Sequence, residues 1–582
     1  MENRVSIQGH RNDIEGLRAI AVMAVICFHF GYLPNGYLGV DVFFVISGYL
    51  ISKIIFKEIA EGRFSLKEFY LRRIRRIIPL VLFINIIALA IGCIVMLPDD
   101  LENLSQSVIA TNAFSNNILQ LITTRNYWDV VNEYKPLMHT WSLGIEEQFY
   151  LFYPILFMLL GKKRPILAFR ILILLTIVSF LLYIFPGAAP SKFYAIPYRF
   201  FELAIGGLGA AIFKNNAIKN IFAFPQLVLL IALIVFKVGI PDYVLLIVTV
   251  LLSLSILISA NQNDFLTSKF LENKIMVGLG MISFSLYMWH QLVLAFTRYF
   301  IIEKYTIYQA AILFIIIVLL SVISFFLIEQ PFRNKKKVST TLLLIVTGSA
   351  FLVTTVFAFR IYILSGVLHD LPELEISTKN ITKNMHSNYN HRIEKMTGTF
   401  SDNEKMKILI IGNSFARDGA NVLLESKYGN NIEISYAYGL DACIDVAAKV
   451  KKANYIIFSE LSKEAYNTIK DKYLIDSNKI WVFGVKSFGV SNGFFYNNRN
   501  KSYYCNQRTE IDKGLIAYNK TLKMNWGKKY INLMDMVIDE KGTMPVFSPD
   551  CKYISQDCRH FTHAGAVYFA SIINRDSTFI LK

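Results

Sequence analysis

The chain has 582 residues, of which 54% are hydrophobic, and it carries a formal net charge of +17. The apolar residues gather in runs of about 17–25, the length that crosses a bilayer, which excludes an ordinary soluble protein over roughly the first 365 residues. The basic residues lie in short loops between those runs, so the positive charge argues for membrane topology and against a nucleic-acid partner.

About eleven candidate membrane spans follow one another along this part of the chain. Their approximate ranges are 17–33, 36–56, 77–97, 143–160, 168–186, 195–213, 221–238, 243–260, 277–300, 306–328 and 338–364. The polar segment that precedes the first span leads to no small-residue cleavage site. We therefore expect the first run to remain as a membrane helix.

The loops between the spans alternate in charge. With the N-terminus in the cytoplasm, the outer loops contain "LPDDLENLSQS", "FPGAAPS" and "GIPD". The inner loops contain "RRIRR" (72–76), "GKKR" (161–164), "KNNAIKN" (214–220) and "RNKKK" (333–337). This positive-inside pattern, with an odd number of spans, predicts that the C-terminal part of the chain lies outside the cytoplasm.

The first span, "LRAIAVMAVICFHF", contains a charged Arg18 and the imidazole of His29. Eleven residues of helix correspond to about 16 Å and to three turns plus about 20°, so both side chains are expected on one face. Ionisable residues at membrane depth usually face a protein interior or an aqueous cavity. The other spans add more of them: Asp41, Glu146, Glu147, Arg199, Glu202, Tyr287 and His290. Together they predict a polar cavity inside the bundle.

The chemistry of these residue types suggests proton transfer beside an anionic ligand. A histidine near its ordinary pKa can take a proton from a hydroxyl or relay one. Arg73 and Arg76, in "RRIRR", suit a phosphate-bearing ligand because a guanidinium holds phosphate through paired hydrogen bonds. The alternatives are that "RRIRR" is only a positive-inside anchor, that Arg18 snorkels to headgroups and that His29 makes a structural hydrogen bond.

The sequence changes character after the last span. Segment 365–405 is polar and is predicted to be a linker. Beyond it, "MKILII", "NIEISYAYG", "ANYIIFSEL" and "KIWVFGV" have the composition of strands and alternate with helix-like stretches. This alternation predicts an α/β domain with a parallel sheet.

The C-terminal part also contains the members of a second candidate site. Ser414 follows the strand "MKILII" directly and precedes a predicted helix, while Asp557 and His560 lie near the other end of the domain in "DCRHFTHAG". Aspartate can orient a histidine three residues on, and the histidine can then activate a distant serine. His563 is a rival base, and the alternative for Ser414 is a tight turn without catalytic function.

The cysteines are compatible with an oxidising compartment for this domain. Cys27 and Cys93 lie in predicted helices, whereas Cys443, Cys505, Cys551 and Cys558 all lie in the C-terminal part. The last four are predicted to form two disulfides, with three pairings open. The alternative is four free thiols in a cytosolic domain.

Five segments resemble the successive signatures of the membrane-bound acyltransferase family 3. They are "DIEGLRAIAVMAVICFHF", "GYLGVDVFFVISGYLIS", "FYLRRIRRIIPL", "TWSLGIEEQFYLFYPI" and "SFSLYMWHQ", in family order across about residues 10–335. The resemblance implies transfer of an acyl group, usually acetyl, from cytoplasmic acyl-coenzyme A to a carbohydrate hydroxyl across the membrane. His29 matches the central catalytic residue, and Arg18, Arg73 and Arg76 match donor-binding positions. Asp41 and Glu146 match family positions whose role the resemblance does not define.

Residues 405–582 resemble the SGNH hydrolase and acyltransferase family. Ser414 matches its nucleophile and Asp557 and His560 match its last block, while Gly439 is a candidate oxyanion glycine. The chain departs from the family in having no clear Gly-x-Asn block after "NYIIFSELS", which leaves the oxyanion hole undefined.

The resemblances imply a polytopic α-helical membrane bundle followed by an extracytoplasmic SGNH-like α/β domain. We expect a membrane domain over 1–335, an additional helix over 336–364, the linker over 365–405 and the SGNH-like domain over 406–582. The implied protein is a bacterial inner-membrane O-acetyltransferase that uses acetyl-coenzyme A as co-substrate, with no permanently bound cofactor and no metal. Its acceptor would be O-antigen, lipopolysaccharide or another surface or lipid-linked polysaccharide. The alternatives are an acyl conduit serving an external transferase, an external esterase, and a non-catalytic glycan-binding domain.

Overall fold

The structure is a computed structural model that describes residues 11–123, 132–161, 164–185, 187, 189–213, 223–259, 265–301, 305–380 and 386–575. The chain divides into two compact units. One comprises Met1–Gly92, Asn103–Arg298 and Glu303–Arg360, and the other Cys93–Glu102, Tyr299–Ile302 and Ile361–Lys582. Of the predicted inner loops, 214–220 and residues 162–163 lie outside the described residues.

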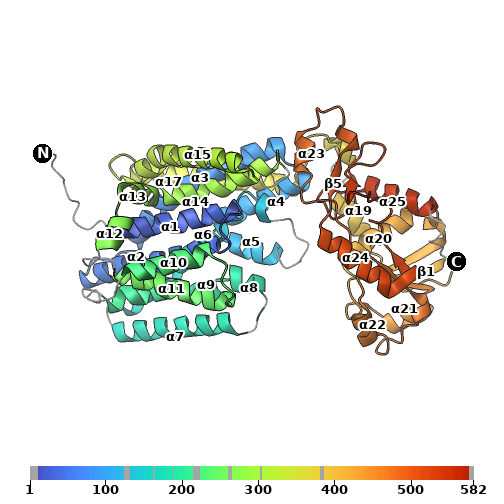
Figure 1. The fold of residues 1–582 in the computed structure, drawn as a ribbon, viewed down its shortest axis with the longest axis horizontal. Helices are drawn as coiled ribbons and strands as arrows, with labels where there is room; N and C mark the ends of the chain where they lie inside the picture. Colours follow the sequence, from blue (N-terminus) through green and yellow to red (C-terminus); the bar gives the residue numbers. More distant parts are fainter. Residues whose placement is uncertain are drawn as a thin grey trace. The chain divides into compact units, whose positions relative to one another are not determined.

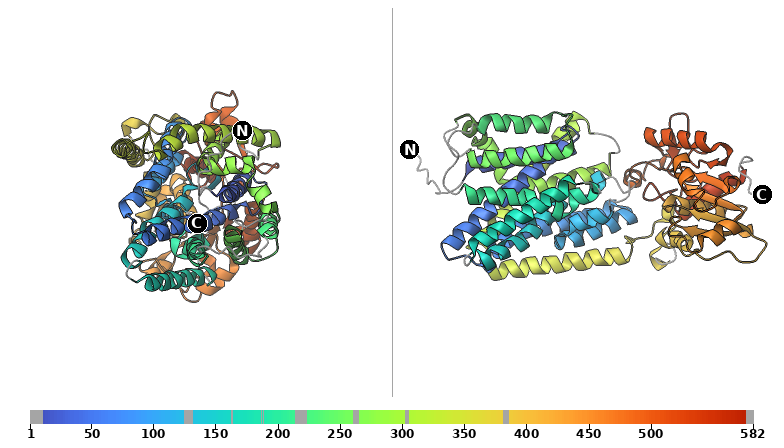
Figure 2. Two further views of the ribbon diagram at one scale, coloured as in Figure 1. Left: turned by 90° about the vertical axis from the view of Figure 1, so that its left-hand side faces the viewer. Right: turned by 90° about the horizontal axis from the view of Figure 1, so that it is seen from below.

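The first unit is built of helices that run side by side in Figures 1 and 2. Their bounds are α1 Asn12–His29, α2 Gly39–Ala60, α3 Leu66–Val95, α4 Pro98–Asn112, α5 Asn116–Thr123, α6 Thr140–Leu160, α7 Pro165–Ile184, α8 Ala189–Tyr194, α9 Ile196–Ile212, α10 Ala223–Val235, α11 Asp242–Ser259, α12 Phe265–Leu271, α13 Lys274–Met281, α14 Ser283–Arg298, α15 Ile307–Ser324, α16 Gln330–Arg333 and α17 Thr340–Ile363. Among these helices, the C-terminal ends of α3 and α17 and the start of α4 fall in the second unit.

Eight helical segments of the described chain are long and apolar enough to cross a membrane, and α13 with α14, bent by 67°, makes a ninth if the pair is one span. The other two predicted spans fall on α1 and α10. α1 carries Asp13, Glu15 and Arg18 in its first two turns, and α10 has only 13 residues. The apolar helical bundle is therefore confirmed, and the count of eleven spans stays a prediction.

Small residues let α2 and α9 approach closely. A Cβ added to Gly48 would strike the carbonyl oxygen of Leu203, and one added to Gly206 would strike that of Val45. In an apolar solvent helices associate through such close packing, because lipid provides little hydrophobic drive between them. The close crossing of α2 and α9 also brings the charged side chains of these two helices into contact.

The second unit contains a five-stranded parallel sheet with strand order β2-β1-β3-β4-β6. The strands are β1 Met406–Ile411, β2 Ile432–Ala437, β3 Tyr455–Ser459, β4 Ile480–Phe483 and β6 Tyr530–Ile531, and an antiparallel pair is formed by β5 Arg508–Glu510 and β7 Thr543–Pro545. The helices are α19 His386–Glu394, α20 Ser414–Glu425, α21 Val446–Lys452, α22 Lys463–Ile469, α23 Gly493–Asn497, α24 Lys513–Trp526 and α25 His563–Arg575. The predicted α/β domain with a parallel sheet is confirmed.

Strand β1 is apolar along its length because both of its faces are buried. Ile408 and Ile410 belong to one hydrophobic cluster, which includes residues of α19, α20 and α25. Leu409 and Ile411 belong to a second cluster, which includes residues of α21 and α22. Alternate side chains of a strand point to opposite faces, so β1 connects two cores.

The segment predicted as a linker is partly structured. Leu371 and Ile376 form an isolated bridge, and α19 packs against the domain, with Ile393 fully buried in the first cluster. Polar composition suggested a linker because α19 buries few of its side chains. A single apolar residue per turn was too weak a signal to identify it.

The prediction of two disulfides is half right. Cys505 and Cys551 are bonded, whereas Cys443 and Cys558 are free and buried. Cys443 lies in the cluster beneath β1 on one face and Cys558 in the cluster on the other, so the sheet separates them. Two thiols in different cores cannot reach the separation that a disulfide requires.

Candidate active sites

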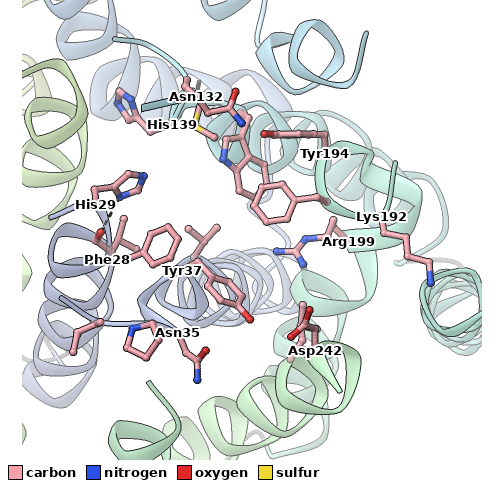
Figure 3. Close-up of a pocket in the computed structure, with 18 of the residues that line it drawn as sticks. Phe28, His29, Asn35, Tyr37, Asn132, His139, Lys192, Tyr194, Arg199 and Asp242 are labelled. Atoms are coloured by element: carbon pink, nitrogen blue, oxygen red, sulfur yellow. Dashed lines mark hydrogen bonds between the residues drawn. The ribbon is translucent and has the colours of Figure 1, made fainter. Parts of the chain in front are cut away.

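The helical unit contains an open cavity of about 1220 Å³. His29 lines it from the last turn of α1, and Figure 3 shows His29 and His139 on one side of the cavity, with Arg199 and Lys192 across it. Trp141 and other aromatic side chains form an apolar part of the cavity wall. A volume of this order accommodates a ligand much larger than an acetyl group.

Three imidazoles and a phenol meet beside this cavity. The ring centroid of His290 lies 5.0 Å from that of His29 and 5.3 Å from that of His139. The Tyr287 ring meets the His139 ring edge to face, with centroids 5.2 Å apart, and its hydroxyl donates to the His139 carbonyl at 2.8 Å. His29 and His290 were predicted to belong to one polar region, and the structure brings them together.

The hydrogen bond of His29 defines its reactive nitrogen. Nδ1 lies 2.8 Å from the Val25 carbonyl oxygen, which can only accept, so Nδ1 carries the proton of the neutral ring. Nε2 then carries the lone pair, which is the form needed to accept a proton from a ligand in the cavity.

A second, smaller cavity of about 90 Å³ contains the predicted donor-binding residues. Arg18, Arg73, Arg76 and Glu146 all line it, and Tyr287 lines both cavities. The prediction that Arg18 and His29 share one face is therefore refined by the structure, because the two residues open onto adjoining cavities. Glu146 accepts from Ser47 at 3.1 Å and Tyr150 at 3.2 Å, which fixes its carboxylate in the wall.

The four arginines of "RRIRR" separate into two pairs because residues three apart share a helix face. Arg73 and Arg76 face the small cavity, and the guanidinium of Arg73 lies 5.9 Å from the Tyr150 ring. Arg75 instead donates to the carbonyls of Phe332 and Val338 at 3.0 and 2.8 Å. Arg72 pairs with Glu58 at 3.0 Å. Only one pair of this basic run is therefore available to a ligand.

Asp41 is not among the described residues that line these two cavities, but it binds Arg199, which lines the large one. Its carboxylate contacts Arg199 at 2.5 Å, and Glu202 contacts the same guanidinium at 3.1 Å. Arg199 lines the large cavity and lies within 6 Å of the Phe44, Trp141 and Phe193 rings. Buried charged side chains are tolerated when they are paired with an opposite charge. The pair therefore lets Asp41 position Arg199 at the cavity wall.

In the α/β unit, Ser414 lies at the carboxyl edge of the sheet. It is the first residue of α20 and is separated from the end of β1 by Gly412 and Asn413. Strand β1 has β2 on one side and β3 on the other. This reversal in strand order is where open α/β sheets form their ligand crevice. Asn413 caps α20 by accepting from the N–H of Phe415 at 2.9 Å, which holds the serine at the helix N-terminus.

The three residues predicted for this site form a continuous hydrogen-bonded series. His560 Nε2 lies 2.8 Å from Ser414 Oγ, and His560 Nδ1 lies 2.5 Å from Asp557 Oδ2. The other Asp557 oxygen accepts the backbone N–H groups of Arg559 and His560 at 2.9 and 2.8 Å, which fixes the loop. The rival base His563 instead pairs with Glu375 at 2.9 Å. The arrangement can draw the proton from Ser414 through a histidine oriented by a carboxylate.

A buried ion pair beneath this series was not predicted. Asp418, one helical turn after Ser414, contacts Lys486 at 2.7 Å and accepts the Phe561 N–H at 3.0 Å, while Lys486 also donates to the Arg559 carbonyl. Burial opposes ionisation of Asp418, but Lys486, His560 and Arg417 together lower the pKa of its carboxyl below the ordinary value. Burial lowers the pKa of the Lys486 ammonium, against the opposing effect of Asp418. The pair fastens the residues on both sides of His560 to the helix that carries Ser414.

A cavity of about 480 Å³ opens beside Ser414. It is lined by Arg417 and by Tyr438, which is 66% exposed and precedes the candidate oxyanion residue Gly439. Where the family pattern would place Gly-x-Asn, the chain has Ser459 and Glu460, and Glu460 accepts from Asn413 at 3.2 Å. Burial raises the pKa of Glu460, opposed by Asn413 and Lys486.

Two of the residues described above lay close to recognised sequence signals. His139 is adjacent to "TWSLGIEEQ", and Asp418 falls within "NSFARDG". Adjacency to a motif was the signal that would have found them. Lys486 carries no such signal, because only the tertiary fold brings β4 and its following loop beneath α20.

An apolar helix bundle with histidine- and arginine-lined cavities, in a chain that also carries a serine–histidine–aspartate series, defines a polytopic membrane protein of the acyl-transfer class. The family described as the acyltransferase domain matches residues 11–330, and the chain belongs to this family.

Curated relatives agree with this assignment. The chain is 32% identical over 310 residues to the peptidoglycan O-acetyltransferase OatA of Listeria monocytogenes, covering 49% of each protein. It is 30% identical over 319 residues to the O-acetyltransferase OatA of Staphylococcus aureus, covering 50% of this chain and 51% of that one. The chain spans about half the length of the curated relatives it matches. No solved structure matches it significantly.

Proposed function

We propose that the protein is a membrane O-acyltransferase that moves acetyl from acetyl-coenzyme A to a hydroxyl of a cell-surface glycan in two steps. The helical unit takes the acyl group from the donor, and the α/β unit, which we assign to the SGNH type, passes it to the glycan through an acyl-Ser414 ester. The hydrogen-bonded series of Ser414, His560 and Asp557 carries this proposal, because a second acyl-handling site has no purpose in a one-step transferase.

Each site has a defined part. Arg18, Arg73 and Arg76 hold the anionic donor at the small cavity, and His29 Nε2 accepts a proton in the large one. In the second step His560 takes the Ser414 proton during acylation and gives it to the departing group of the acyl donor. It then takes the proton of the glycan hydroxyl, which attacks the ester, and gives that proton to Ser414 Oγ as the ester bond breaks. The N-terminus is cytoplasmic and the α/β unit extracytoplasmic in a bacterial inner membrane, in agreement with the loop charges.

The acceptor follows from where the α/β unit would lie. Peptidoglycan is the acceptor named for the Listeria relative, and O-antigen or a lipid-linked polysaccharide is the other surface glycan that this topology can reach. Cells that lack the native enzyme should be complemented with wild type, His29→Ala or Ser414→Ala at matched membrane levels. Ester-linked acetate is then measured separately in peptidoglycan and in extractable polysaccharide.

We expect both variants to lose product in the same glycan fraction. Loss with His29→Ala alone would make the helical unit the complete transferase and the α/β unit a glycan-binding accessory. Loss with Ser414→Ala alone would make the bundle an acyl conduit. Cleavage of acetylated glycan by the wild type, without any gain of acetate in cells, would indicate an esterase.

A further inference from the structure

His139 is a buried polar side chain that the structure leaves without an internal partner. It is 1% exposed, precedes α6 as its cap residue and caps no backbone N–H with its side chain. Neither ring nitrogen has a hydrogen-bond partner among the described residues. Leaving a buried donor without a partner is energetically unfavourable, so His139 suggests a ligand that completes its hydrogen bonds.

The position of His139 identifies that ligand. His139 and His29 both line the large cavity, and both rings pack around His290. His139 also contacts Tyr287, which lines both this cavity and the arginine-lined one. His139 and His29 therefore both line the cavity that adjoins the proposed donor site.

The two imidazoles differ in what they can supply. His29 uses its N–H on the Val25 carbonyl and presents a lone pair, so it suits proton acceptance. A neutral His139 has one N–H, and no acceptor among the described residues uses it. A neutral imidazole can polarise a carbonyl as a hydrogen-bond donor, which requires no buried positive charge.

We propose that His139 is a second catalytic residue of the helical unit, which donates a hydrogen bond to the carbonyl oxygen of the acyl group. This inference rests on the proposed acyl-coenzyme A donor. An acceptor hydroxyl attacks the thioester carbon while His29 Nε2 takes its proton, and negative charge develops on the oxygen held by His139. The carbon–oxygen bond forms, the carbon–sulfur bond breaks, and the proton on His29 passes to the departing thiolate. The products are an ester and the free thiol of coenzyme A.

The test uses inverted membrane vesicles that contain the full chain, with acetyl-coenzyme A as the probe and release of its thiol as the readout. His139→Phe keeps an aromatic ring against Tyr287 and His290 but removes the donor, whereas His139→Gln and His139→Asn each restore an N–H near one ring nitrogen. His563→Phe, at an exposed histidine of the other unit, is the matched control.

We expect His139→Phe to reduce kcat by roughly 10²–10³-fold with little change in KM for acetyl-coenzyme A, as for loss of one oxyanion donor. Either His139→Gln or His139→Asn should recover at least tenfold of the lost kcat. The lower pH limit of activity should not move in these variants, because the proposed proton acceptor is His29 and not His139. Full activity of His139→Phe would overturn the inference, as would equal losses in all three variants at matched folded levels, which would indicate packing alone. Absence of thiol release by the wild type would instead refute the proposed function.

Discussion

The ion pair of Asp418 and Lys486 yields a quantitative prediction. In Asp418→Asn the amide oxygen can still accept the Phe561 N–H, but the Lys486 ammonium stays buried without its counter-charge. Both side chains are at most 3% exposed, and loss of one partner from such a pair costs about 3–5 kcal/mol. We expect local opening of α20 and of the 557–563 loop to increase by more than about 100-fold.

A second substitution separates charge from packing. Lys486 lies 4.2 Å from the Phe415 ring and 4.9 Å from the Phe561 ring, so Lys486→Met places an apolar chain between them. The double variant should recover at least half of the lost stability, because no unpaired charge remains. It should not recover full Ser414-dependent ester hydrolysis, since the Arg559 carbonyl loses its donor and His560 is held less firmly in position.

The assay is amide hydrogen exchange on the full chain, followed in peptides from α20 and the 557–563 loop, together with hydrolysis of a small acetyl ester. Asp441→Asn is the matched control, because its pair with Lys472 is 88% and 62% exposed and such exposed pairs contribute little to stability. The folded pKa of Asp418 lies below its unfolded value near 3.9, so its contribution to stability is complete above that pH and is lost as the pH falls through the folded pKa. Unchanged exchange in Asp418→Asn, or no rescue by Lys486→Met, would refute this reasoning.

Three further predictions concern the donor site, the disulfide and the triad. Arg73→Gln should raise KM for acetyl-coenzyme A about tenfold or more, whereas Arg63→Gln, more than half exposed, should leave KM unchanged; equal effects would assign both to general membrane anchoring. Reduction of Cys505–Cys551, which closes 46 residues, should destabilise the α/β unit by up to about 4 kcal/mol in exchange experiments, and a shift below 0.5 kcal/mol would contradict the bond. His560→Ala should slow ester hydrolysis by at least about 10³-fold, and retention of the rate would exclude it as the base.

The sequence by itself determined the classes of structure and the main candidate residues. Apolar runs of membrane length and alternating strands are local patterns, and each is set by which faces of one element must be buried. Ser414, Asp557 and His560 were predicted from the turn after a strand and from a three-residue spacing, and the structure joins them in one series. Each of these signals lies within a few residues of the chain, so the sequence alone reveals it. The contact between Ser414 and His560, which are 146 residues apart, is seen only in the structure.

Only the tertiary structure decided which charges meet. It separated Arg73 and Arg76 from Arg75, paired Asp41 with Arg199 across 158 residues, and placed His139 beside His29. It likewise divided the cysteines between the two faces of one sheet, which no spacing could reveal. Such contacts depend on the rotation and crossing of whole helices and strands. Hydrophobic periodicity defines which face of an element is buried but does not specify the partner residue on the element that covers it.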